Sequence, residues 1–147
     1  MGTGMHRAAA LWLGLLLSMG CRGIGSEPPV EGEILLGQGG GFTGLYSGHV
    51  VRSDGKVFRW SQMPGQAERT EELGRVPADS VQPFLRTLAR WEHEGKSIAG
   101  TGNMVLFIEF RHAATRYRLQ WGIGETVAPE VQEFYRELEQ FLRRHFP

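Results

Sequence analysis

The chain has 147 residues, and its 16 basic and 16 acidic side chains give a formal net charge of zero. This balance argues against a nucleic-acid-binding protein, which carries a basic excess or stripe, and the single cysteine excludes an internal disulfide and a thiolate metal cluster. The length predicts one compact domain that buries about two thirds of its unfolded surface.

An apolar segment over residues 8–17 follows the early basic residue Arg7. It is too short to span a hydrocarbon core, which needs ~20 residues, and it is followed by small residues. This order is typical of an export signal peptide. Ser18 and Gly20 suit ordinary signal peptidase, so we expect a signal peptide over residues 1–20 that is removed by cleavage after Gly20.

The end of this segment also resembles the lipobox of bacterial lipoproteins, through Leu16, Leu17, Gly20 and Cys21. In that family a lipid is joined to the cysteine sulfur and the chain is cut before the cysteine. The family usually has Leu where this chain has Ser18. Both interpretations cut at the same bond and differ only in whether Cys21 carries lipid, and a single cysteine at this boundary favours lipidation. The resemblance implies a membrane partner, reached through an acyl anchor on Cys21.

Residues 21–32 have no apolar period and contain the pair Pro28-Pro29, which cannot enter a helix or a central strand. We expect a lipidated tether that holds a domain over residues 33–147 near the membrane. Arg22 stands where lipoproteins retained in the inner membrane of enteric bacteria tend to have Asp. The resemblance therefore implies an outer-membrane location, facing the periplasm or the cell surface.

A short predicted strand over residues 33–36 leads into a glycine-rich loop. Three of its glycines match the G-x-G-x-x-G pattern of phosphate sites, but a strand and not a helix is predicted next, which argues against a dinucleotide site. An irregular loop in which glycine permits positive φ is the plainer interpretation. The other interpretation is a contact with a protein or peptide partner, and the candidate residues are Gly39, Gly40, Gly41, Phe42, Thr43 and Gly44.

Asp54-Gly55 separates two further strands, over residues 45–53 and 56–61, and is a strong hairpin signal. A two-residue turn there places two pairs on one apolar face, Val51 opposite Phe58 and His49 opposite Trp60. We interpret this histidine as a core or edge residue, because no second histidine lies at metal-ligand spacing.

A weakly alternating, charged segment over residues 66–76 predicts a solvent-facing edge strand. A helix is then predicted from near Ser80, capped by Asp79 or Ser80, with Pro83 in its first turn. Its apolar stripe consists of Val81, Phe84, Leu85, Leu88 and Trp91. The sequence Glu92-His93-Glu94 is interpreted as a solvated last turn, with metal or acid-base chemistry as the weaker alternative.

Alternation over residues 104–111 resumes over 117–121 and predicts a central hairpin. The expected pairs are Phe110 with Tyr117, Ile108 with Leu119, Leu106 with Trp121, and Glu109 with Arg118. The other face carries polar side chains that form either a solvated sheet surface, which is the favoured interpretation, or a ligand surface: Glu109, Arg111, Arg116, Arg118 and Gln120.

A final amphipathic helix is predicted from Pro129, with a stripe formed by Val131, Phe134, Tyr135, Leu138, Phe141 and Leu142. Two helices and five or six strands in hairpins predict an α+β domain, with both helices on one face of an antiparallel sheet. The order of elements resembles small uncharacterised lipoproteins of Gram-negative bacteria, a resemblance that implies no activity.

The sequence therefore favours a membrane-anchored envelope protein that binds a ligand or assists another protein, without an enzymatic activity. It shows no nucleophile with base and acid, no metal-spaced histidines and no cofactor motif. Two alternatives remain open. One is an inhibitor of an envelope protease or lysozyme that uses the loop over residues 39–44. The other is an enzyme whose active site has no sequence motif.

Overall fold

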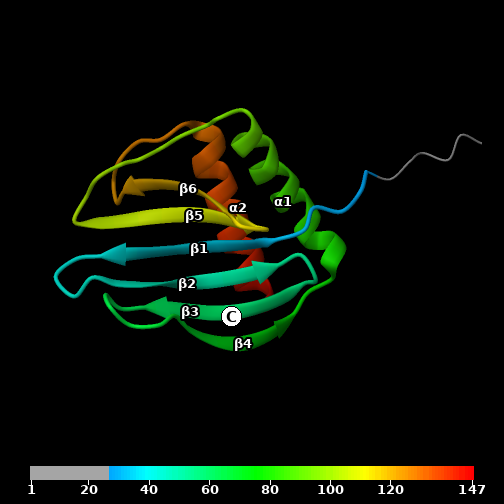
Figure 1. The fold of residues 1–147 in the computed structure, drawn as a ribbon, viewed down its shortest axis with the longest axis horizontal. Helices are drawn as coiled ribbons and strands as arrows, with labels where there is room; N and C mark the ends of the chain where they lie inside the picture. The colour runs from blue at the N-terminus through cyan, green and yellow to red at the C-terminus, as the bar shows by residue number, and fades with distance from the viewer. Residues whose placement is uncertain (1–26) are drawn as a thin grey trace, which may run out of the picture.

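The computed structural model describes residues 27–147, so the predicted signal peptide and the predicted lipid attachment site Cys21 lie outside the described residues. Six strands and two helices make up the described chain (Figure 1). In order they are β1 (Glu33–Gly40), β2 (Leu45–Arg52), β3 (Lys56–Gln62), β4 (Arg69–Arg75), α1 (Ala78–His93), β5 (Met104–His112), β6 (Thr115–Gly122) and α2 (Pro129–His145).

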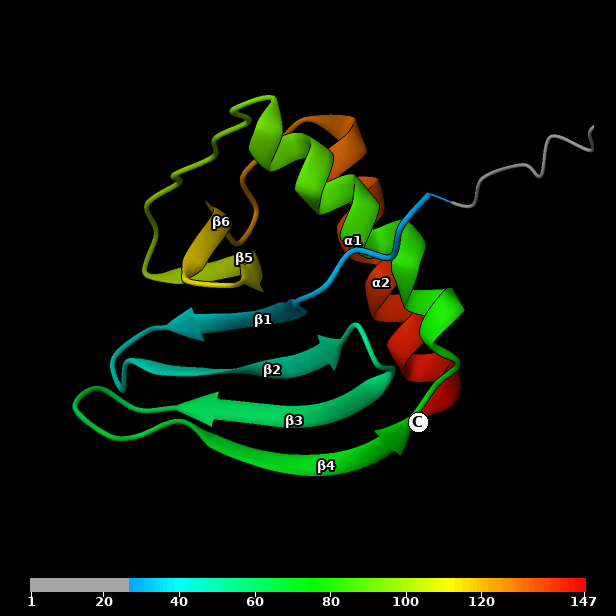
Figure 2. The same ribbon diagram turned by 45° about the vertical axis from the view of Figure 1, so that its right-hand side comes forward.

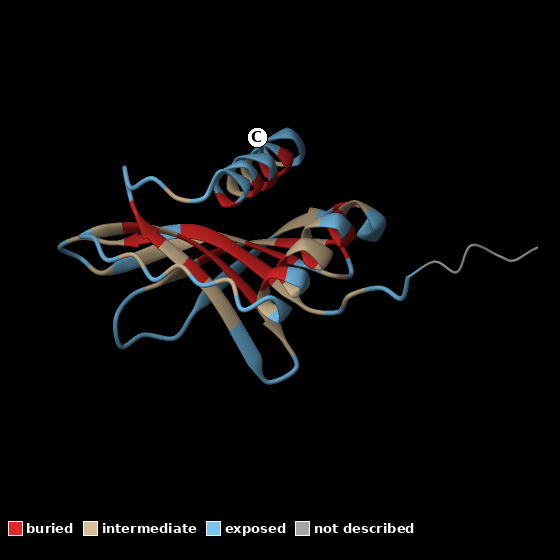
Figure 3. Cartoon of the chain, turned by 90° about the horizontal axis from the view of Figure 1, so that it is seen from above, coloured by how far each residue is buried: buried red, intermediate tan, exposed pale blue. Residues whose placement is uncertain are grey.

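All six strands form one open antiparallel sheet in the order β4-β3-β2-β1-β5-β6. The segment containing α1 carries the chain from the β4 edge to β5, which pairs with β1. Figure 3 shows both helices on the same side of the sheet. The predicted α+β class, with two helices on one face of an antiparallel sheet of five or six strands, is confirmed, and the sheet has six.

The main core lies between the helices and this face of the sheet. Both helices contribute their predicted stripes, and the strands contribute every second residue, including Ile34, Val51, Ile108 and Leu119, each almost fully buried. Aromatic rings join the two helices, since Phe134 of α2 packs against rings from α1. Burial of an apolar stripe in this way is the main source of stability for a helix of this length.

The start of α1 differs from the prediction. The helix begins at Ala78, Pro77 occupies the N-cap position, and no side chain caps the first turn. The hydroxyl of Ser80 instead donates to the carbonyl oxygen of Pro77, at 2.6 Å. Pro83 is therefore the sixth helical residue and not part of the first turn. Its missing N–H costs one backbone hydrogen bond, which the buried stripe of α1 outweighs.

The predicted register of the β2–β3 hairpin was wrong by one residue. Val51 pairs with Val57 and His49 with Arg59, because the loop has three residues, Ser53, Asp54 and Gly55, and not two. Gly55 has a φ of 87° and donates to the carbonyl of Arg52, the geometry of a turn that ends in a glycine bulge.

The shift also changes which face each side chain occupies, because neighbouring strand residues point to opposite faces. Val51 and Val57 belong to the core under the helices, whereas Phe58 and Trp60 lie on the opposite face. The hairpin therefore has apolar residues on both faces, and the prediction of a single apolar face was wrong.

The predicted pairs of the central hairpin are all confirmed between β5 and β6, and only Ala113 and Ala114 lie between its last paired residues. The segment predicted as an edge strand is also confirmed, since β4 lies at one edge of the sheet and its side chains are largely exposed. Its charged side chains discourage pairing with another chain.

The last residues of the predicted tether contact the domain before β1 begins. The backbone N–H and carbonyl of Val30 both bond the side-chain amide of Gln82 on α1, at 2.8 and 3.2 Å. Glu27 forms an ion pair with Arg86 of the same helix. Neither helix in residues 27–147 has the length and apolarity needed to cross a bilayer.

Candidate ligand-binding cleft

The face of the sheet opposite the helices, here called the open face, carries a second buried cluster. It consists of Leu35, Val50, Trp60 and Phe107, with Tyr46 and Phe58 partly buried beside them. Neither α1 nor α2, the two helices of residues 27–147, packs on this face, so within the described chain side chains of the sheet itself exclude water from the cluster (Figure 3). A sheet face that only contacts solvent does not usually contain a buried apolar cluster.

Phe107 shows how neighbouring side chains exclude water from this cluster, because its ring is completely buried although neither α1 nor α2 covers it. The rings of Trp60 and Tyr46 lie 5.8 and 6.0 Å from it, and the Arg118 guanidinium lies 4.0 Å above it. A cation held over an aromatic face is attracted by the ring quadrupole. Arg118 therefore covers the aromatic cluster and presents positive charge to the open face.

Glycines below these rings let them lie close to the backbone. A Cβ atom at Gly39 would overlap the Tyr46 ring, and one at Gly48 would overlap the carbonyl oxygen of Leu36. Close approach of a ring or a neighbouring strand is one of the roles that glycine has inside strands.

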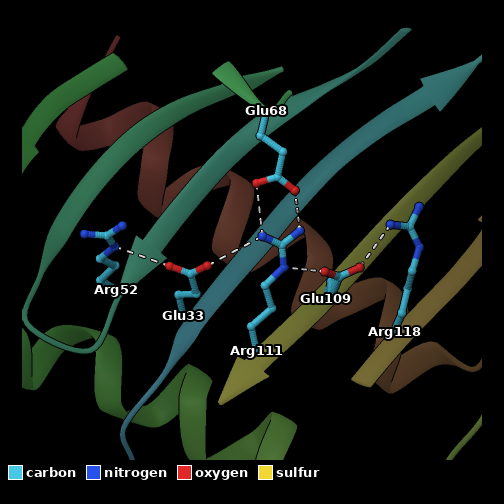
Figure 4. Close-up of polar contacts among 6 residues, drawn as sticks. All are labelled: Glu33, Arg52, Glu68, Glu109, Arg111 and Arg118. Atoms are coloured by element: carbon cyan, nitrogen blue, oxygen red, sulfur yellow. Dashed lines mark hydrogen bonds and ion pairs between the residues drawn. The ribbon is translucent and has the colours of Figure 1, made fainter. Parts of the chain in front are cut away.

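Glu109 lies at the centre of the polar part of the open face and is only 5% exposed. One carboxylate oxygen accepts a hydrogen bond from Nε of Arg111, at 2.5 Å, and the other accepts one from Arg118, at 3.2 Å (Figure 4). Two guanidinium groups thus compensate one buried carboxylate, as a buried charge requires. Arg118 also donates twice to the amide oxygen of Gln120, which orients it.

Glu68 reaches this network from the connection between β3 and β4. Its two carboxylate oxygens accept hydrogen bonds from the two terminal nitrogens of Arg111, at 3.0 and 3.3 Å. These bonds lower the pKa of Glu68 below its ordinary value. Burial alone would lower the pKa of Arg111, but its bonds to Glu68 and Glu109 raise it. Glu33 is a third carboxylate near Arg111, at 3.6 Å.

A cleft of about 550 Å³ opens above this network, within the size range of ligand pockets. Its lining residues are Tyr46, Trp60, Gln62, Glu68, Glu109, Arg111, Arg116 and Arg118. A second, more open hollow of about 680 Å³ adjoins it at the start of β1 and shares Arg111 and Arg116 with it. We call the first hollow the open-face cleft.

Two groups in the cleft have unused hydrogen-bonding capacity among the described residues. The indole Nε1 of Trp60 is buried and forms no hydrogen bond of adequate geometry. The Glu68 carboxylate nevertheless lies near this nitrogen, and the contact helps to lower the pKa of Glu68. Arg116 is exposed and forms no ion pair or side-chain hydrogen bond within residues 27–147. Buried donors without a partner are rare in folded proteins and call for an explanation.

Four of the five residues that the sequence suggested as a polar ligand surface therefore line one cleft, and the fifth, Gln120, orients Arg118. Sequence reasoning missed the other four lining residues, Tyr46, Trp60, Gln62 and Glu68. The register error placed Trp60 on the helix face. No local pattern could have brought Glu68 to Arg111, because 43 positions separate the two residues.

Only part of the predicted partner loop is a loop: Gly39 and Gly40 belong to β1, and residues 41–44 form the hairpin end between β1 and β2. Gly40, Gly41 and Gly44 have positive φ, which explains these glycines by backbone geometry. The same loop leaves Phe42 fully exposed. Figure 1 shows it at the end of β1 opposite to the one at which the described chain enters the sheet. Strand β2 follows this loop directly, so the loop is a hairpin turn and not a phosphate cradle before a helix.

A second polar cluster joins the end of α1 to the β5–β6 turn. Nε2 of His112 lies 2.6 Å from a carboxylate oxygen of Glu92 and 2.9 Å from the hydroxyl oxygen of Thr115. In a catalytic triad the acid and the nucleophile contact different ring nitrogens of the histidine. Here both contact the same nitrogen, and the hydroxyl also bonds the carbonyl of His112, so this cluster stabilises the turn.

His49 lies half-buried in another groove, beside Arg59 and the last turns of α2. Burial, followed by the charge of Arg59, lowers its pKa, so the imidazole is neutral at pH 7. Within residues 27–147 no three His, Cys, Asp or Glu side chains gather closely enough to hold a metal ion.

No protein-family model and no curated protein matches this sequence. The assignment of the open-face cleft therefore depends on its geometry alone.

Proposed function

We propose that this protein is a membrane-tethered binding protein of the bacterial envelope whose ligand site is the open-face cleft. The observation that carries the proposal is that one cleft on the open face is lined by two aromatic residues, Tyr46 and Trp60, and by Arg116, and that within residues 27–147 the Trp60 indole N–H has no well-formed hydrogen bond and Arg116 has no ion pair. Ligand sites are mostly concave and apolar, with a few convergent polar groups. The open-face cleft is concave and has convergent polar groups, but its lining is mainly charged, and its apolar surface comes from Tyr46 and Trp60.

The test of the cleft uses the ¹⁵N-labelled domain and the indole N–H resonance of Trp60, assigned through Trp60→Phe. A collection of small polar and aromatic fragments is titrated while all backbone and indole resonances are followed. We expect ligands to shift the indole signal of Trp60 and the backbone signals of β5 and β6. Fragments that bind only in the groove beside His49 would contradict the assignment.

The anchoring half of the proposal depends on the residue pattern that ends at Cys21. Cys21→Ser should move the protein from the membrane fraction to the soluble fraction and remove the acyl mass of the mature chain. Gradient fractionation with inner- and outer-membrane markers then tests the expected outer-membrane location. A mature wild-type chain of unmodified mass would refute the acyl anchor.

A protein partner at the loop over residues 39–44 is a second candidate function, favoured by the complete exposure of Phe42. An aromatic side chain at a hairpin tip can insert into a pocket of an envelope protease or lysozyme, or of another partner. Phe42→Ala should leave the melting temperature unchanged and lose the partner in a pull-down from membrane extract. Retention of the same partner by Phe42→Ala would exclude this loop.

A further inference from the structure

We infer that the open-face cleft takes a ligand with one carboxylate and an adjacent apolar group, and that Glu68 occupies the place of this carboxylate in the free protein. The inference deepens the proposed function and rests on it. It begins from the geometry of Glu68, whose two oxygens face the two terminal nitrogens of Arg111 in a fork (Figure 4). This two-bond arrangement is the usual way in which arginine recognises a carboxylate.

Arg111 does not depend on Glu68 for compensation of its charge. Its Nε donates to Glu109, and Glu33 lies 3.6 Å from one of its terminal nitrogens. Two carboxylates therefore remain near the guanidinium when Glu68 leaves, so removal of Glu68 does not create an unpaired buried charge. A ligand carboxylate can take the same two N–H groups without disturbing the buried pair beneath.

The position of Glu68 in the fold allows such a displacement. Glu68 belongs to the connection between β3 and β4, which contains Pro64 and a Gly65 with φ of 72°, and its side chain is about one third exposed. The other acid of the network, Glu109, lies within β5 and is buried. Segments with few buried contacts open at low free-energy cost, whereas central strands do not.

Charge and unused donors favour an anion in the place that Glu68 leaves. Without Glu68 the cleft lining has three arginines and one glutamate, a net charge of +2. The Trp60 indole N–H, which now lies beside the Glu68 carboxylate without a well-formed bond, becomes available to the incoming group. Arg116, which forms no ion pair within residues 27–147, adds its positive charge to the cleft lining.

The walls of the cleft define the rest of the ligand. Tyr46 is half-buried, packs against Phe107 and lies with its ring centre 5.7 Å from the Arg118 guanidinium, so it adds an aromatic wall to the cleft that also contains the Arg111 fork. An apolar or aromatic group beside the carboxylate would cover this ring. The chemistry fits both a free organic acid and the C-terminus of a peptide that ends in an apolar residue.

The test measures binding by the Trp60 indole resonance with three probes. These are 3-phenylpropionate, its uncharged amide 3-phenylpropionamide, and the dipeptide acid N-acetyl-alanyl-phenylalanine. The proteins are the wild type, Glu68→Gln and Arg116→Gln. Glu72→Gln is the matched control, because it makes the same chemical change on exposed β4 at a residue without an ion pair.

We expect the two acids to shift the indole signal and the amide to fail. Removal of the internal competitor in Glu68→Gln should tighten binding of the acids about 3- to 10-fold, as expected for loss of a partly exposed ion pair and one negative charge. Arg116→Gln, at an exposed residue that lines the cleft, should weaken binding of the acids. The acid that binds more tightly identifies the source, a free metabolite or a peptide end.

Equal binding of acid and amide would overturn the inference, as would Glu68→Gln binding no more tightly than Glu72→Gln. Neutral fragments that bind at Trp60 while both acids fail would overturn it alone and leave the proposed cleft function in place. Failure of every fragment and probe at Trp60 would overturn both.

Discussion

Glu109→Gln provides the sharpest test of how the open face is held together. The substitution keeps the size of the side chain but removes the charge that compensates two arginines. Removing one partner of a fully buried pair costs about 3 to 5 kcal/mol. Here the side chains of Arg111 and Arg118 are 17% and 32% exposed, and each keeps another acceptor, so we expect about 2 to 3 kcal/mol.

For a domain of this size the loss corresponds to a fall in melting temperature of roughly 8 to 12 °C. Urea unfolding followed by circular dichroism gives the free energy directly, and Glu71→Gln is the matched control. Glu71 makes a single exposed pair with Arg59, at 3.2 Å, so its loss should cost less than about 0.5 kcal/mol. If Glu109→Gln costs no more than this control, the open face is not held together by Glu109 and the account of the cleft fails.

Three further predictions concern the core, a close backbone contact and pH. Phe134→Ala should cost about 3 to 5 kcal/mol, because the buried ring packs 5.1 Å from Trp91, and a melting temperature within a degree of wild type would contradict the packing of α2. Gly48→Ala should lower the free energy of unfolding in urea by about 2 kcal/mol or more, because the added Cβ would overlap a backbone oxygen of β1 that cannot move away. A neutral effect would show that β1 and β2 are farther apart than in this structure. Arg111 lowers the pKa of Glu68 below its ordinary value of 4.5. The ion pair of Glu68 with Arg111 therefore contributes fully to folding stability above pH 4.5, and this contribution is lost as the pH falls through the lowered pKa. The free energy of unfolding of wild type should exceed that of Glu68→Gln by less than about 1 kcal/mol at pH 7, and this difference should shrink to nothing in acid. A difference that grows below pH 4.5 would contradict a lowered pKa of Glu68.

The strongest sequence predictions were those in which local periodicity and burial agree. Alternation over β5 and β6 correctly predicted the four pairs named for that hairpin, because a slip of one residue would move the apolar residues of a strand to the other face. The stripe of α2 was equally clear, and Val131, Phe134 and Leu138 are buried as predicted. These patterns record which side of each element meets the core.

Predictions that depended on turn geometry were less secure. The Asp54-Gly55 pair correctly located a hairpin, but a two-residue and a three-residue loop share this signal and differ by one position in register. Similarly, Asp79 and Ser80 are good capping residues, yet Pro77 takes the N-cap position. In both places a residue type compatible with two local geometries cannot by itself select between them.

The sequence by itself determined the fold class, both helices, the edge strand and the polar side chains on one face of the central hairpin. Only the tertiary structure decided that these side chains form a cleft. Pairing of β1 with both β2 and β5 brings Tyr46 beside Phe107, and the β3–β4 connection places Glu68 on Arg111. Such contacts join segments far apart in the chain, and no local periodicity encodes them, because they depend on strand order and on the path of a connecting loop.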